Sequence, residues 1–262
     1  MDPAKEEAKV ISPAHDPIRV VPLHLPDELR KLTAAPQPAA NLTYRGGPLL
    51  TAVEVFTVFW GAAWSQSPQA EVMASVNQFF DFILTSALID QLAEYNVPGQ
   101  AISHGSRSGT AVLTTPPATR SVTDHQVQQL LQKESGTGGA LPAPTPQTLY
   151  FVYLPPGVLV TQGGGRSCLT FCGYHSDIAG SVFYAVMPYP DCAGCTGGLQ
   201  PLDALTSTSS HELCEAITDP VPGQGWYDDQ HGEIGDICAW STRQMGGYTV
   251  QLEWSNKSGA CI

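Results

Sequence analysis

This sequence has few positive charges and no long apolar run. Lys and Arg total 12 of 262 residues against 24 Asp and Glu, which gives a formal net charge of -12. No cluster of basic residues is available to neutralise phosphates, so nucleic-acid binding is not an expected function. No stretch approaches the roughly 18–20 consecutive apolar residues that a membrane-spanning helix needs, so no membrane partner is expected either.

The composition is that of a folded, globular protein. Hydrophobic residues make up 42% of the chain and charged residues only 14%, which a disordered chain would not show. Residues 1–40 are rich in proline and charge and lack a clear hydrophobic period. We therefore expect an extended N-terminal arm over 1–40, followed by a single domain over 41–262.

Cysteines are absent from the first half of the chain and concentrated in the second. The seven are Cys168, Cys172, Cys192, Cys195, Cys214, Cys238 and Cys261. An odd count leaves at least one thiol unpaired in a monomer. The first four fit either a four-thiolate zinc site or two or more disulfides with Cys261 as a spare partner, and the loose C-x3-C spacing favours disulfides.

Cysteine usage of this kind favours an extracellular or periplasmic protein. The first residues, MDPAKEEAKVISPAHDPIRVV, are charged and interrupted by prolines. They do not match a secretory signal peptide, which needs an uninterrupted apolar core.

Hydrophobic periodicity divides the domain into alternating strands and helices. The expected strands are 52–60, 148–160, 181–189 and 248–254, and the expected helices are 68–95, about 123–134 and 203–217, the last with Asp203 as its N-cap. Residues 163–177 are expected to form a loop. This pattern predicts an α/β or α+β domain with a mixed sheet flanked by helices.

The helix expected at 203–217 carries the pattern with the most chemical content. His211 and Glu215 are four residues apart and therefore project from one helix face, with Glu212 on the adjoining edge. In the HExxH motif the two outer positions hold zinc and the glutamate activates water. A carboxylate is a competent zinc ligand at the second position. We therefore expect a zincin-like, metal-binding helix.

A second acidic segment, GWYDDQHGEIGDICAW at 225–240, strengthens this expectation. Its apolar residues should draw it onto the core, so that some of its carboxylates need a partner such as a metal. We expect Asp236 or Glu233 to supply a third ligand. A Cys214–Cys238 disulfide would hold this segment beside the helix. Lone loop histidines are seldom ligands, so His175 is a reserve ligand or oxyanion donor.

Several short motifs, taken in order, resemble the Exordium-type, phosphate-induced proteins. They are Arg45-Gly-Gly-Pro-Leu-Leu50, Phe59-Trp60-Gly61, Cys168-x3-Cys172-Gly-Tyr-His175, Cys192-Ala-Gly-Cys195 and Thr218-Asp219-Pro220 with Gly225-Trp226-Tyr227, within about residues 43–240. The resemblance implies a shared scaffold. The His-Glu pair departs from the plant members, which are cell-wall or apoplastic proteins, and is similar to microbial relatives described as metallopeptidase-like.

The leading functional hypothesis is a zinc-dependent hydrolase, most simply a peptidase. His211, Glu215 and Asp236 or Glu233 would bind zinc, Glu212 would act as general base, and Tyr227 or His175 would stabilise the oxyanion. The substrate would be a peptide or a small molecule, the latter for a hydrolase or lyase using the same metal. The alternative is a non-enzymatic extracellular or surface-binding protein in which the cluster holds a structural cation, calcium or zinc.

Overall fold

A six-stranded mixed sheet forms the centre of the protein. The computed structural model describes residues 20–24 and 39–262. The strand order is β1-β9-β10-β6-β3-β4. Strands β10, β6, β3 and β4 are parallel neighbours, whereas β9 pairs antiparallel with both β10 and β1. These strands are β1 Val20–Pro22, β3 Glu54–Trp60, β4 Ser106–Leu113, β6 Thr148–Tyr153, β9 Phe171–Ile178 and β10 Val182–Met187.

The remaining elements are short strand pairs and the helices that cover the sheet. The strands are β2 Thr43–Tyr44, β5 Ser121–Thr123, β7 Leu159–Gln162, β8 Gly165–Arg166, β11 Trp226–Tyr227, β12 Thr242–Met245, β13 Tyr248–Gln251, β14 Trp254–Ser255 and β15 Ala260–Cys261. The helices are η1 Ala62–Ser65, α2 Gln69–Ile83, α3 Ala87–Gln91, η2 Leu92–Tyr95, α4 Asp124–Glu134, α5 Ala193–Thr196, α6 Pro201–Thr218 and η3 Asp236–Cys238.

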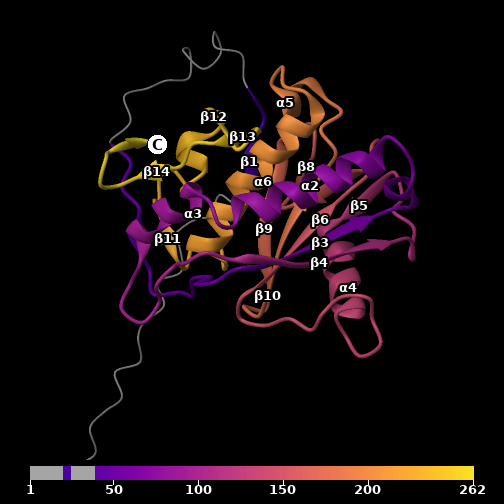
Figure 1. Ribbon diagram of the computed structural model, residues 1–262, viewed down its shortest axis with the longest axis horizontal. Helices are drawn as coiled ribbons and strands as arrows, with labels where there is room; N and C mark the ends of the chain where they lie inside the picture. The colour runs from indigo at the N-terminus through magenta and orange to yellow at the C-terminus, as the bar shows by residue number, and fades with distance from the viewer. Residues whose placement is uncertain (1–19, 25–38) are drawn as a thin grey trace, which may run out of the picture.

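Helices cover both faces of the sheet, so the central strands are buried on both sides (Figure 1). Alternate residues of β3 and β6, such as Phe59 and Phe151, face α2 and α6. Their neighbours, such as Val58 and Val152, face α4. Parallel strands buried on two faces are nearly continuous in hydrophobicity, which is the pattern that the sequence shows. The predicted α/β or α+β fold with a mixed sheet and flanking helices is confirmed.

Two of the predicted elements are shorter than expected. A local side-chain hydrogen bond divides one of them, and residues without an N–H group end the other. The helix expected at 68–95 breaks at Ser86, whose side chain accepts a hydrogen bond from the Leu88 N–H and caps α3. The strand expected at 148–160 ends before Pro155 and Pro156, since proline cannot donate to a sheet ladder. Its remainder, β7, belongs to a separate three-stranded sheet.

Two other expectations about the chain are changed by the structure. Residues 163–177 are not a loop throughout, because β9 occupies their second half. Most of the arm expected at 1–40 lies outside the described residues, but Val20–Pro22 forms the edge strand β1 against β9. Within the described ranges no single helix is long and apolar enough to cross a membrane. The bent pair formed by residues 69–83 and 87–95 is long and apolar enough by length and composition alone. Its apolar residues pack in the core.

Three disulfides hold the C-terminal third together. They join Cys168 to Cys192, Cys172 to Cys195 and Cys238 to Cys261. The disulfide interpretation of the first four cysteines is confirmed.

The predicted Cys214–Cys238 pair is wrong, because Cys238 is bonded to Cys261. The β14–β15 hairpin brings the Cα of Cys261 to 5.7 Å from that of Cys238. Cys214 instead faces the apolar core, where it is a free, buried thiol.

This arrangement predicts the outcome of alkylation and peptide mapping. Native protein treated with a thiol reagent should stay unmodified at Cys214, because the side chain is fully buried, and should react there only after denaturation. Peptides separated without reduction should contain the three bonds described above. Recovery of a Cys214–Cys238 peptide, or rapid labelling of Cys214 in the native protein, would contradict the structure.

Candidate metal centre

The candidate site is built on helix α6, which is buried along most of its length. The helix starts with Pro201 at its first position, where the missing N–H costs nothing, and Gln200 is its N-cap. Asp203 is therefore not the N-cap that the sequence suggested. It lies in the first turn, where its carboxylate accepts a hydrogen bond from the Thr249 hydroxyl. From Ala204 to Thr218 every side chain of α6 is buried.

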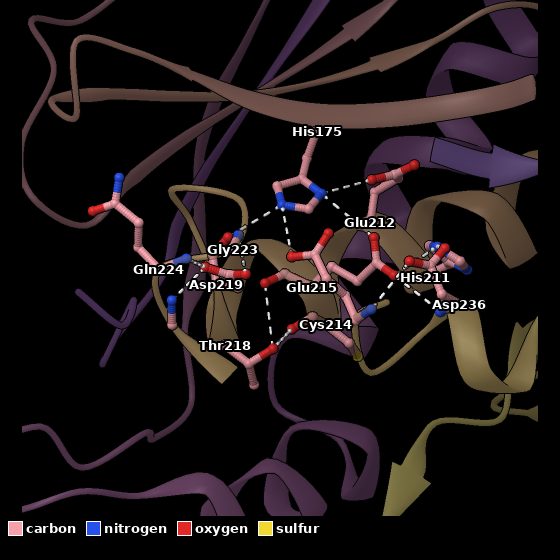
Figure 2. A network of polar contacts seen from close by, with 12 residues as sticks. His175, His211, Glu212, Cys214, Glu215, Thr218, Asp219, Gly223, Gln224 and Asp236 are labelled. Atoms are coloured by element: carbon pink, nitrogen blue, oxygen red, sulfur yellow. Dashed lines mark hydrogen bonds and ion pairs between the residues drawn. The ribbon is translucent and has the colours of Figure 1, made fainter. Parts of the chain in front are cut away.

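The predicted pairing of His211 with Glu215 is present. Nε2 of His211 lies 2.9 Å from Oε1 of Glu215, one helical turn away. Figure 2 shows both side chains on the same side of α6, together with Glu212. His211, Glu212 and Glu215 each have no exposed surface.

His175 reaches this group from the central sheet. Alternation along β9 places Gly173 and His175 on the face that α6 covers, and Glu212 approaches between them. His175 Nδ1 lies 3.0 Å from Oε2 of Glu212 and 3.4 Å from Oε2 of Glu215. The sequence suggested His175 only as a reserve, because its strand was expected to be a loop.

The acidic segment closes over the helix, as the sequence led us to expect. The Asp236 N–H donates to Oε1 of Glu215 over 3.0 Å, and Oδ1 of Asp236 lies 3.9 Å from Nε2 of His211. Glu233 lies on the other side, with Oε1 3.4 Å from Nε2 of His175. The structure therefore brings His211, Glu215, Asp236 and Glu233 into one cluster.

Two further carboxylates lie beside the cluster and were not singled out from the sequence. Asp219 accepts hydrogen bonds from the N–H groups of residues 223–225, and its carbonyl oxygen lies 3.2 Å from Nε2 of His175. Its place directly after the helix was the only available signal. Glu253 is fully buried after β13, and burial raises its pKa well above the ordinary value. Nothing in its sequence context distinguishes it.

Tyr227 has a different setting from the one expected for a substrate contact. It lies on β11, paired with β2, and the Arg45 guanidinium lies 4.7 Å from the centre of its ring. The cluster contacts described above do not involve Tyr227. Its suggested role at an oxyanion stays a prediction.

The histidines and carboxylates of the cluster shift one another's pKa values. Burial alone lowers the pKa of both histidines, but the neighbouring carboxylates outweigh it, chiefly Glu233 for His175 and Glu215 for His211, so both pKa values are raised well above normal. Burial raises the pKa of Glu212, Glu233 and Asp236. Burial acts in the same direction on Glu215, but the two histidines reverse it and lower its pKa. Such a set attracts positive charge, as protons or as a metal ion.

Many polar atoms of the cluster have no hydrogen-bond partner among the described residues. These atoms are both ring nitrogens of His211, Oε1 of Glu212, Oε2 of Glu215, both carboxylate oxygens of Glu233 and Oδ1 of Asp236. The 2.9 Å contact of His211 with Glu215 is close but does not have hydrogen-bond geometry. Buried carboxylates are normally hydrogen-bonded, paired or bound to metal. The donor set therefore fits a metal ion, and His175/Glu212/Glu215 and His211/Glu215/Asp236 each place three ligand atoms close together.

Access to the cluster is closed in this conformation. Asp236 is its most exposed side chain, at 5%. Two surface cavities, of about 430 and 580 Å³, are lined by residues outside the cluster. The segment over α6 is in close contact with the helix, because a Cβ added at Gly235 would lie only 2.8 Å from Cγ of His211.

Comparisons of the sequence with protein-family models and with curated proteins found no match. The chemical character of the site is therefore inferred from its own geometry.

The close approach at Gly235 yields a test of this geometry. Gly235→Ala should lower the free energy of unfolding by about 1–3 kcal/mol, since the added methyl group forces the segment away from His211 and Glu215. The φ of -80° at Gly235 suits any residue, so backbone strain is not a competing cause. Chemical denaturation measures the effect.

Gly136→Ala is the comparison variant, since its added Cβ would lie 3.3 Å from the Lys133 carbonyl oxygen, a milder contact than that at Gly235. It should change stability less than Gly235→Ala does. Equal stability of the Gly235 and Gly136 variants would show that the segment does not pack against α6 as described.

Proposed function

We propose that the protein is a zinc-binding protein whose buried centre includes His211, Glu215 and Asp236. The observation that carries this proposal is the set of buried carboxylate oxygens and imidazole nitrogens that converge without hydrogen-bond partners among the described residues. Leaving such groups unpaired costs several kcal/mol each, and a divalent cation removes that cost.

The ligand types favour zinc over calcium. Calcium takes only oxygen ligands, six to eight of them, whereas zinc accepts imidazole nitrogen and carboxylate oxygen together. Ligand atoms about 2.0–2.1 Å from a tetrahedral ion lie roughly 3.3 Å apart. The separations at Nε2 of His211, 2.9 Å to Glu215 and 3.9 Å to Asp236, fall on either side of this value.

The calcium alternative would use carboxylates of the acidic segment, but Asp228 in this segment already accepts several hydrogen bonds. Asp228 accepts hydrogen bonds from the N–H groups of Asn41, Gln230 and His231, so its oxygens stabilise the loop itself. This leaves the residues around His211 as the better-supported cation site.

The near-complete burial of the centre supports a structural role for the ion. His211 and Glu215 belong to α6, while Asp236 belongs to the segment that the Cys238–Cys261 disulfide anchors. An ion shared between them would fasten this segment to the helix. Structural zinc sites are closed and have four protein ligands, so a structural ion here would need one neighbouring group as a fourth ligand beside these three.

The second candidate is the zinc-dependent hydrolase expected from the sequence. Glu212 supports it, because its Oε1 is buried beside the cluster and has no hydrogen-bond partner. Zinc, when bound, supplies Lewis acidity that makes a water molecule easier to deprotonate. Glu212 would take the proton, and the 228–238 segment would have to move aside to admit a peptide or small-molecule substrate. The resemblance to Exordium-type proteins also stays a prediction. It implies a shared scaffold and does not indicate which reaction the site would catalyse.

Zinc titration tests the leading proposal. Protein purified in chelator should take up zinc, and at zinc concentrations 100 times Kd its free energy of unfolding should rise by about 2.7 kcal/mol for each site. His211→Ala should lose this stabilisation, because it removes the imidazole ligand. Elemental analysis and thermal unfolding provide two independent readouts.

His104→Ala is the control, since this side chain is about half exposed and pairs with Asp90 on the surface. It should bind and respond to zinc like the unmodified protein. If the unmodified protein gains neither zinc nor stability, the proposal of a zinc centre fails.

Glu212→Gln tests the hydrolase. If Glu212 is the general base, this variant should keep its zinc content and lose hydrolysis of a mixed peptide library by about 100-fold or more. A chelator-treated sample provides the baseline. An undiminished rate in the variant would show that Glu212 is not the general base. If the unmodified protein hydrolyses peptides no faster than the chelator-treated sample, only the structural role of the ion is supported.

A further inference from the structure

We propose that the centre holds two divalent cations, with Glu215 bridging them. One ion is the zinc proposed above, at His211, Glu215 and Asp236, and the inference rests on that proposal. The second lies among His175, Glu212 and Glu215. Each group brings one atom from each of its residues within 4.8 Å of the others.

Glu215 has the position of a bridging ligand. Its Oε1 lies 2.9 Å from Nε2 of His211, and its Oε2 lies 3.4 Å from Nδ1 of His175. The two oxygens of one carboxylate are thus directed to two different imidazoles (Figure 2). A carboxylate of this kind binds one ion through each oxygen.

The surroundings of His175 would also suit a metal ligand. Nδ1 is hydrogen-bonded to Oε2 of Glu212 at 3.0 Å and lies 3.4 Å from Oε2 of Glu215, close to the roughly 3.3 Å expected between zinc ligands, so an ion at this point would replace the hydrogen bond. Nε2 faces the carbonyl oxygen of Asp219 at 3.2 Å, and this oxygen can only accept. Metal-binding histidines commonly donate their other N–H to a backbone carbonyl, which fixes the ring.

Charge balance favours two ions over one. Glu212, Glu215, Glu233 and Asp236 are all buried and would carry four negative charges when ionised. Two divalent cations neutralise these four charges with both histidines neutral, and ionised Asp219 and Glu253 beside the cluster would only add to the excess of negative charge. A single cation leaves two negative charges buried, which is costly unless protons replace it.

Glu212 therefore has a different role here from the one in the hydrolase hypothesis. As a ligand of the second ion it would not be free to accept a proton. The oxygen Oε1, which has no hydrogen-bond partner, would complete the ligation or orient a water molecule. The metal content of Glu212→Gln separates the two roles, because a general base is not needed to hold the ion.

The experiment is a titration of chelator-treated protein with zinc alone and with cobalt(II) alone. The unmodified protein should bind two ions per chain, and its two cobalt ions should show spin coupling by electron paramagnetic resonance. Glu212→Gln and Asp236→Asn should each bind one ion, and neither should show coupling. Glu215→Gln should weaken binding of both ions at least tenfold. His104→Ala should match the unmodified protein.

The outcomes separate the two proposals. Two coupled ions, falling to one in either single variant, support the bridged pair. One ion in the unmodified protein overturns the second site and leaves the zinc proposal standing, whereas no ion overturns both. Two ions retained in Glu212→Gln overturn the assignment of Glu212 as a ligand. If a variant does not fold, by circular dichroism and its disulfide map, ion count and coupling in the unmodified protein still decide.

Discussion

The burial of acidic side chains against helix α6 is the constraint on which the functional part of this structure depends. Glu212, Glu215 and Glu233 have no exposed surface, and the imidazoles of His175 and His211 lie between them. Removing charges from water is costly unless they are paired, so the surrounding elements are stable only if positive charge accompanies the carboxylates. Protons can supply this charge, as the raised histidine pKa values show. A metal ion supplies it with better-defined geometry.

The scaffold brings these groups together from three places in the chain. The sheet presents His175 on β9, α6 presents the His211 motif, and the segment at 228–238 covers both. Glycines permit the close approach, since side chains at Gly173 and Gly235 would collide with side chains of α6. The disulfide to Cys261 then anchors the covering segment. A closed centre of this kind suits an ion that supports the fold, and catalysis would require the segment to open.

Local patterns in the sequence predicted those features that depend on neighbouring residues. The i,i+4 spacing of His211 and Glu215 is a property of any helix, and the dense β-branched and aromatic run at 52–60 predicted a buried strand. Thr123 and Gln126 form a capping box at the start of α4, which likewise depends only on residues close together in the sequence. Features that depend on the partner of a residue were less predictable. The sequence did not predict strand β9. Its polar residues are buried by α6 and β10, and a local sequence pattern does not reveal such contacts.

The sequence by itself determined the fold class, the His-Glu pattern on α6 and the acidic segment that meets it, because each follows from periodicity, spacing or composition. Only the tertiary structure decided that His175 joins the cluster and that Cys238 pairs with Cys261 and not with Cys214. It also decided that Glu215 faces two imidazoles at once. These results depend on which strand and which hairpin lie beside α6, and contacts between residues far apart in the chain leave no local pattern in the sequence.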